Sequence, residues 1–330
     1  MLTLPAAQPG AIKLSMFISP DPPDDELLFA RQLGMDYVYT WLEDHQRSFE
    51  YLVALRQKVE DAGLILYNAG NMSVAKSDRI HLALPGRDES IAEFQTFIRN
   101  LGRAGIHTTT FTWEPDRVWS SPPGATRSSP ARQVNLAELA LRPLTHGREY
   151  SRAELWDNFE YFIRRIIPVA EEAGVRLALH PNDPPVDGKL GGIPCLIHSG
   201  ADYLRAFELA ASPNLGMEFC VGCWLEGDAA FGDLFQAIRR FTEEGRIFIV
   251  HFRNISSPLP VFTETYLDNG YMDMARVMKC FWDAGYSGTM ILDHSPQMAP
   301  SYKGAGVAYA TGYMRALMQL AALPGSVPGC

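Results

Sequence analysis

Short apolar runs alternate along the chain with longer segments in which apolar residues recur every three or four positions, and this alternation repeats eight times. The short runs predict β-strands, and the longer segments predict amphipathic helices. Segments such as WDNFEYFIRRIIPVAEEAG, from Trp156, end in glycine, as helices with glycine C-caps do. The eight predicted strands begin at Lys13, Asp36, Leu64, His107, Val175, Leu215, Arg246 and Gly288.

This order of elements favours the α/β class, as a (β/α)8 TIM barrel formed by one domain over residues 1–330. No change of composition marks a linker between two domains. A doubly wound open sheet is the alternative, but no G-x-G-x-x-G follows the first strand and no G-x-x-x-x-G-K-[ST] occurs. We expect the tail, residues 324–330, to be frayed.

One segment, residues 114–151, interrupts the alternation after the fourth strand. It is rich in Pro, Ser and Arg and too long for an ordinary connection between a strand and a helix. Its position predicts an insertion at the carboxyl-terminal face of the barrel, where lids form. A disordered insertion is the open alternative.

Composition narrows the classes of partner. The chain is 47% apolar and 20% charged, with a formal net charge of −9, and has no cluster of basic residues, which disfavours nucleic acid as a partner. The first ten residues lack the basic and apolar regions of a secretion signal, and no run of eighteen apolar residues occurs. We therefore expect a cytoplasmic protein that binds small molecules and neither membranes nor nucleic acid.

Four of the predicted strands end in residues that bind metals. In a (β/α)8 barrel the carboxyl ends of the strands converge on one mouth. Taken singly, each residue has an ordinary explanation: a hydrogen-bonded histidine, a buried cysteine, an aspartate that caps a helix. Together they predict a divalent metal site, because all four occur at the same end of consecutive strands. The predicted ligands are His180, Cys220, His251 and Asp293.

The mixture of donor atoms limits which metals are reasonable. Thiolate, imidazole and carboxylate together suit Mn, Fe, Co or Zn, whereas Ca and Mg prefer shells made only of oxygen. Asp183, in the segment HPNDPP, is a candidate to orient the His180 imidazole by hydrogen bonding, or alternatively to cap a turn.

The segments HPNDPP and LGGIPCLI, followed by EFCVG, VHFRN, FTETYLDNGYMDM and LDHSP, resemble in order the motifs of mannonate dehydratases. These are metal-dependent enzymes of the xylose-isomerase-like TIM-barrel group. IHLALPGRDESI and TFIRNLGRAGI add similarity in the first half of the chain. The resemblance assigns the metal, typically manganese, to the four residues at the strand ends, and it implies homodimers.

The chain departs from that family's pattern at several positions. Asn182 stands where the family has Asp, and Leu267 stands where it commonly has His. Cys195 replaces an Arg, and Ile291-Leu292 precede Asp293 where the family has Arg-Pro. These changes remove basic partners for the carboxylate of a sugar acid.

The resemblance implies a lyase that dehydrates a sugar acid, converting D-mannonate to 2-keto-3-deoxy-D-gluconate. His294 and Tyr302 are the predicted acid/base residues, with Tyr309 as the alternative tyrosine. The predicted contacts to the substrate are Asn68, Trp113, Asp183, Arg253 and Asn254. Trp113 is equally suited to the core.

Two other functions stay open. The lost basic residues suit a metal-dependent isomerase or epimerase of an uncharged sugar. A non-catalytic relative that binds a sugar is the third hypothesis, and the retention of all four predicted ligands and of His294 argues against it.

Overall fold

The computed structural model describes residues 12–116, 118–299, 304–325 and 327–328. All eight predicted strands form, and they pair in parallel in one sheet with the order β3-β2-β1-β15-β12-β11-β8-β4. Their bounds are β1 Lys13–Phe17, β2 Tyr37–Leu42, β3 Ile65–Asn71, β4 Thr108–Thr112, β8 Arg176–His180, β11 Leu215–Cys220, β12 Ile247–Phe252 and β15 Thr289–Leu292. The predicted (β/α)8 barrel is confirmed.

The barrel is closed by its two outer strands, β3 and β4. The side chain of Asn68 in β3 donates a hydrogen bond to Thr110 Oγ1 in β4, at 3.0 Å. All six residues of β11 are buried, because the strand lies between the barrel interior and the surrounding helices.

The register of the strands brings the predicted ligands to one rim. Thr112 in β4 pairs with His180 in β8, Cys220 in β11 pairs with His251 in β12, and His251 pairs with Ile291 in β15. Since neighbouring strands are in phase, the residues at their carboxyl ends lie side by side.

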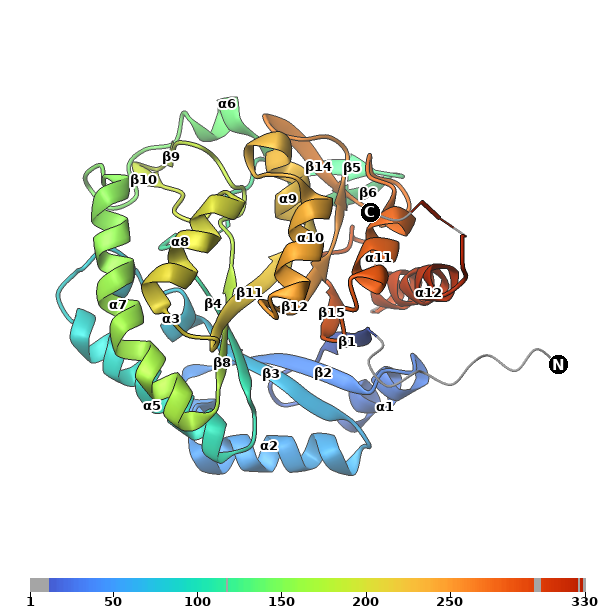
Figure 1. The fold of residues 1–330 in the computed structure, drawn as a ribbon, viewed down its shortest axis with the longest axis horizontal. Helices are drawn as coiled ribbons and strands as arrows, with labels where there is room; N and C mark the ends of the chain where they lie inside the picture. The colour runs from blue at the N-terminus through green and yellow to red at the C-terminus, as the bar shows by residue number, and fades with distance from the viewer. Residues whose placement is uncertain (1–11, 117, 300–303, 326, 329–330) are drawn as a thin grey trace.

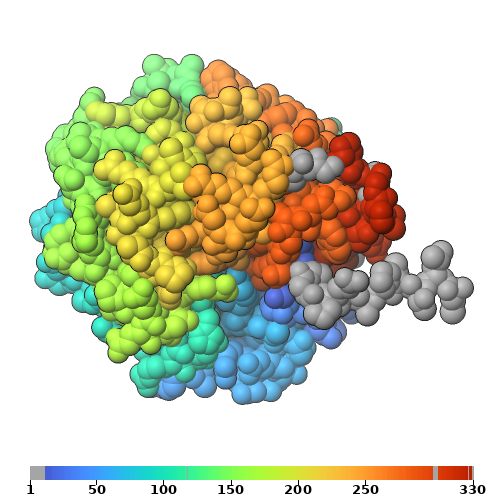
Figure 2. Space-filling view, in the orientation of Figure 1, coloured from blue at the N-terminus to red at the C-terminus, as the bar shows by residue number. Residues whose placement is uncertain are grey.

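Helices surround the sheet, and in the space-filling view they cover the side of the barrel that faces the reader (Figures 1 and 2). The longest begins with a capping box, in which Ser151 and Glu154 each accept a backbone N–H of the other, and ends at Gly174 with φ of 63°. The helices are α1 Asp24–Gln32, α2 Phe49–Asp61, α3 Met72–Ala75, α4 Asp78–His81, α5 Arg87–Arg103, α6 Leu136–Leu139, α7 Arg152–Ala173, α8 Gly200–Ala210, α9 Val221–Gly227, α10 Leu234–Glu243, α11 Met274–Asp283 and α12 Ala305–Ala321, with single 3-10 turns η1 Asp44–Gln46 and η2 Asp228–Ala230.

The segment 114–151 forms small elements of its own. It contains a hairpin of β5 (Gly124–Thr126) and β6 (Ser129–Ala131), then β7 (Gln133–Asn135) and α6. β7 pairs antiparallel with β14 (Val261–Thr265), which follows β12 in the chain, and β14 pairs with β13 (Asn254–Ile255). Figure 1 shows β5, β6, β14 and α6 at one end of the barrel. The segment is therefore part of the barrel's carboxyl-terminal face, beside the short strands β9 (Lys189–Leu190) and β10 (Ile193–Pro194).

Within the described ranges, none of the helices has the length and apolar character needed to cross a bilayer. The predicted tail begins after α12 has ended, and positions 326, 329 and 330 lie outside the described residues.

Candidate metal centre and active site

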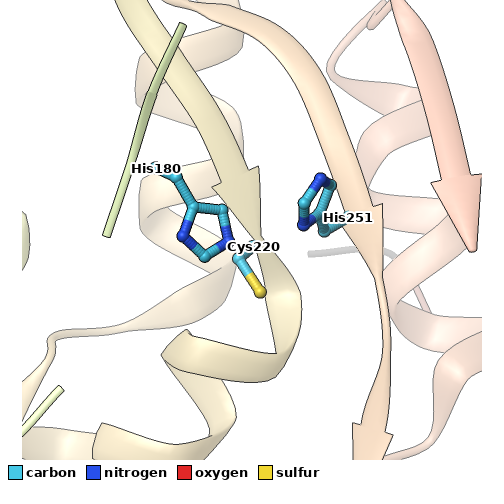
Figure 3. Close-up of side chains that lie close together, drawn as sticks. All are labelled: His180, Cys220 and His251. Atoms are coloured by element: carbon cyan, nitrogen blue, oxygen red, sulfur yellow. The ribbon is translucent and has the colours of Figure 1, made fainter. Parts of the chain in front are cut away.

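Three of the four predicted ligands form a compact cluster at the rim of the barrel. His180 and Cys220 are the last residues of β8 and β11, and His251 is the last but one of β12. One ligand atom from each lies within 4.8 Å of the other two, and the two imidazole rings are 5.0 Å apart (Figure 3).

The fourth predicted ligand, Asp293, lies directly after β15 and contacts two members of this cluster. Its Oδ1 lies 3.2 Å from His251 Nδ1, and its Oδ2 lies 3.5 Å from Cys220 Sγ. The structure thus brings together all four residues that the strand ends predict.

The histidines are oriented as metal ligands are. The carbonyl oxygen of Pro181 lies 2.7 Å from His180 Nδ1 and accepts its proton, so the Nε2 lone pair of this imidazole is free. Glu218 Oε1 lies 2.9 Å from His251 Nε2, on the far side of that ring from Asp293. His251 Nδ1 is buried, and its contact with Asp293 Oδ1 at 3.2 Å lacks the alignment of a good hydrogen bond. A nitrogen placed in this way beside a thiol and a carboxylate is what a divalent cation would satisfy.

The surroundings of the Cys220 sulfur favour its thiolate form. Burial alone would raise the pKa of this thiol, but a hydrogen bond from Cys223 and the charge of Arg253 outweigh burial and hold the pKa well below its usual value. The backbone N–H of Cys223 lies 3.4 Å from this sulfur. Since the thiolate is the ligand form of cysteine, these contacts prepare Cys220 for a metal.

A buried ionic network lies beneath the cluster, and Arg253 is its centre. The guanidinium is fully buried, and its NH2 nitrogen lies 3.0 Å from Asp183 Oδ2 and 2.8 Å from Glu226 Oε1. Its other nitrogens contact Glu264 and Asp293, at 2.5 and 3.2 Å. Arg253 therefore positions the ligand Asp293 from below.

The inserted segment contributes a second arginine to this network. Arg132 lies 2.7 Å from Asp183 Oδ1 and 3.0 Å from Glu264 Oε1. Burial alone would lower the pKa of Arg132 and of Arg253, but the surrounding carboxylates outweigh burial and raise the pKa of both. Both guanidinium groups therefore remain charged. The two carboxylates each bridge Arg132 to Arg253.

A cavity of about 290 Å³ opens beside the cluster. This volume is close to the lower end of the range for small-molecule sites, roughly 300–1,000 Å³. Three of the predicted ligands, His180, His251 and Asp293, line this cavity. The lining residues with titratable side chains are Tyr39, Lys76, Glu114, His180, Asp183, Glu218, His251, Asp293 and His294.

Four predicted substrate contacts are not in the lining of this cavity. Trp113 is fully buried and packs against Phe159 and Phe162, and Arg253 has no exposed surface. The Asn254 amide donates to the carbonyls of Leu267 and Met272.

Asn68 is the fourth, and it is buried in the barrel interior. Its amide donates to Thr110, whose hydroxyl donates to Glu218, the partner of His251. Among the described residues, Asn68, Trp113, Arg253 and Asn254 do not line the cavity, because core packing, ion pairs or hydrogen bonds already engage these side chains. Their direct contact with the substrate stays a prediction.

Asp183 lines the cavity. The sequence offered it as a candidate to orient the His180 imidazole, but it makes no hydrogen bond to that ring. The backbone of Pro181 takes that role, and both carboxylate oxygens of Asp183 face arginines. Burial alone would raise the pKa of Asp183, but Arg132 and Arg253 outweigh it and lower the pKa.

His294 lies at the mouth of the cavity, with 42% of its side chain exposed. Glu264 Oε1 lies 2.8 Å from its Nδ1, and Asp293 Oδ1 lies 3.4 Å from its Nε2. Burial lowers the pKa of this imidazole, but the two carboxylates outweigh it and raise the pKa to about 9.

The two candidate tyrosines cannot be compared directly. Tyr302 lies outside the described residues. The hydroxyl of Tyr309 donates to Asp268 at 2.8 Å, and Arg127 donates to that hydroxyl at 3.3 Å. Tyr309 does not line the cavity.

Sequence reasoning missed several charged residues of the site, among them Glu218, Arg132 and Lys76. Glu218 left a visible signal, since it is a lone acid in a strand that is otherwise apolar, two residues before a predicted ligand. Arg132 and Lys76 left none, because each lies in a polar stretch far in sequence from the residues that it contacts.

The fold and the cluster define a class of protein: a (β/α)8 barrel whose mouth carries a site for a divalent metal beside a cavity. The family model of D-mannonate dehydratase (UxuA) matches residues 130–327. The chain is 31% identical over 283 residues to mannonate dehydratase of Thermotoga maritima, covering 74% of this chain and 77% of that protein. It superposes on the crystal structure of mannonate dehydratase from Streptococcus suis serotype 2 with a TM-score of 0.82 and 26% identity, covering 93% and 94% of the two chains.

A D-psicose 3-epimerase structure matches with a TM-score of 0.62 and 14% identity, covering 93% of this chain and all of that one (100%), which shows a shared fold alone. The chain belongs to the D-mannonate dehydratase family, a family of metal-dependent enzymes that dehydrate a sugar acid.

Proposed function

We propose that this chain removes water from D-mannonate to give 2-keto-3-deoxy-D-gluconate, with a divalent cation held by His180, Cys220, His251 and Asp293. The observation that carries the proposal is the cluster itself: three ligand atoms within 4.8 Å of one another, with Asp293 in contact with two of them, beside a cavity. Membership of the family supports the choice of substrate.

Manganese is the metal that we propose, with Fe, Co and Zn as the other metals that this set of donors suits. When bound, such a cation stabilises the negative charge that develops on the substrate as the proton leaves C2. The chain's own part is to hold the ligands in place. Glu218 fixes the His251 imidazole, and Arg253 fixes Asp293.

The reaction breaks the C2–H and C3–O bonds and leaves an enol, which becomes the 2-keto product. One group must accept the C2 proton, and another must donate a proton to the departing 3-hydroxyl. We assign one of these transfers to His294, since Glu264 holds its Nδ1 and the ring lies at the cavity mouth. Tyr302 stays the predicted partner in proton transfer.

Five further residues support the site in this proposal. Asp183 and Arg253 keep the ligand set charged and oriented, and Asn68 supports Glu218 through Thr110. Trp113 and Asn254 stabilise the loops that surround the mouth. The homodimer and the cytoplasmic location stay predictions.

The test is an assay of the purified protein loaded with manganese. D-mannonate should yield a keto-deoxy acid, detected by colour reaction, and removal of the metal with a chelator should abolish the product. His294→Gln should reduce kcat by at least roughly a hundredfold while the metal content stays the same.

Two outcomes would contradict the proposal. A protein that binds metal, fails on mannonate and related aldonates, and interconverts an uncharged sugar would be an isomerase or epimerase. A protein that binds a sugar acid but no metal would be a non-catalytic relative.

A further inference from the structure

A sugar acid carries a carboxylate, which a binding site pairs with a positive charge. The two arginines near the site do not supply this charge. Arg132 and Arg253 contact carboxylates of the protein itself, and neither lines the cavity.

Lys76 supplies a positive charge in the cavity wall. It follows α3, in the loop after β3, and its neighbours Met72 and Ala75 line the same cavity. Among the described residues that line this cavity, Lys76 is the one lysine or arginine. Its side chain is 17% exposed, so the ammonium group is largely shielded from water.

The ammonium group is anchored on one side and available on the other. Glu114 Oε2 lies 2.5 Å from Lys76 Nζ, and Glu114 Oε1 accepts the backbone N–H of Asp183 at 3.3 Å. A lysine has three N–H donors, and Glu114 uses one of them. Burial raises the pKa of the Glu114 carboxyl although Lys76 lowers it.

We infer that Lys76 binds the carboxylate of the substrate and makes the site select an aldonate over an uncharged polyol or sugar. This inference rests on the proposed function, since it assigns the residue that recognises the acid group of that substrate. A charge-assisted contact in a partly dry cavity is among the stronger polar interactions available to a protein.

The experiment compares the binding of D-mannonate and of D-mannitol, a polyol of the same carbon number, to the manganese-loaded full chain by calorimetry. The unaltered protein should bind the acid more tightly than the polyol. Lys76→Met should weaken binding of mannonate by at least about tenfold and leave mannitol unchanged, while Lys76→Arg should keep most of the preference. Lys58→Met is the matched control, because Lys58 lies on the outer helix α2 and pairs there with Asp24 at the start of α1.

Glu114 is buried, so Lys76→Met alone leaves it without its cation. The double variant Lys76→Met, Glu114→Gln removes both charges and keeps the volume, and it should lose the preference for the acid as well. Thermal unfolding and manganese content should match those of the unaltered protein in this double variant.

The results separate this inference from the proposed function. If the unaltered protein dehydrates mannonate and the double variant keeps the full preference for the acid, Lys76 is not the carboxylate site and the function stands. If the acid binds in a manner that depends on Lys76 but no keto-deoxy acid forms, the inference stands and the reaction is different. A protein that shows no preference for the acid over the polyol overturns the inference.

Discussion

Gly222 shows how closely the site constrains a single residue. A Cβ atom placed on Gly222 would lie 1.9 Å from Arg253 Nε and 2.6 Å from its Cζ. Arg253 is fully buried and held by acids on several sides, so it has no space into which it can move. Gly222→Ala should therefore destabilise the fold by about 1–3 kcal/mol or more and lower manganese affinity.

Thermal unfolding and a manganese titration check this prediction. The matched control is Gly312→Ala in α12, where a Cβ atom would have no neighbour within 4 Å. It should leave manganese affinity unchanged and stabilise the fold slightly, by about 0.5–1 kcal/mol, because alanine favours a helix interior. A Gly222→Ala protein with the manganese affinity and unfolding temperature of the unaltered chain would show that Arg253 does not occupy this place.

His81 gives a prediction for pH. Its ring is buried 4.3 Å from the ring of Trp113, and burial, with a smaller effect from Lys76, lowers its pKa from 6.5 to about 3. Between pH 6.5 and about pH 3, the His81 imidazole is therefore protonated in the unfolded chain but neutral in the folded chain. Stability should be full above pH 6.5 and should fall by about 1.4 kcal/mol per pH unit toward pH 3 on account of this residue.

Urea unfolding at pH 6.5 and at pH 5 measures this loss. In His81→Gln the loss should be smaller by about 2 kcal/mol, because no imidazole remains to be protonated in the unfolded chain. His107→Gln, at an exposed position, controls for the removal of a histidine and should leave the loss unchanged. Equal losses in the His81→Gln and unaltered proteins would contradict the prediction.

At the scale of elements, the alternation of apolar runs and amphipathic segments was sufficient to predict all eight barrel strands. Most residues of these strands are buried, and such burial leaves short apolar runs in the sequence. The strands β7 and β14 leave no such run, because their sequences, QVN and VFTET, are largely polar. Their pairing depends on contacts between segments about 130 residues apart, such as Arg132 with Glu264, which a local pattern does not contain.

The inserted segment should depend on Arg132 for its attachment to the barrel. Arg132→Met would leave Asp183 and Glu264 with less compensating charge in a buried place, which costs about 3–5 kcal/mol for a broken buried pair. The expected result is a lower unfolding temperature and faster cleavage within residues 114–151 by proteinase K.

Arg148→Met is the control for this prediction, since Arg148 is 53% exposed in the same segment and pairs with Glu154 at the surface. It should leave both the cleavage rate and the unfolding temperature almost unchanged. Cleavage of Arg132→Met at the rate of the control would mean that β7 alone holds the segment.

At the scale of the whole molecule, the site is a consequence of closing the barrel. That the four residues of the candidate metal site lie together could be predicted because the fold places every strand end at one rim, so identity and phase along the chain were enough. The roles of Arg253, Asn254 and Trp113 could not be predicted in this way. Those residues also follow strand ends, and only the packed structure shows that their side chains turn away from the cavity.

Because the ligands come from four different strands, manganese should stabilise the barrel as a whole. A metal that binds only the folded state at a hundred times its Kd adds about 2.7 kcal/mol, and at ten times its Kd about 1.4 kcal/mol. If Cys220→Ser weakens binding tenfold, the rise in unfolding temperature at that manganese concentration should be about half of that in the unaltered protein. Cys195→Ser, which alters a buried thiol bonded to the Pro184 carbonyl, should retain the full rise. An equal rise in Cys220→Ser and in the unaltered chain would remove this sulfur from the set of ligands.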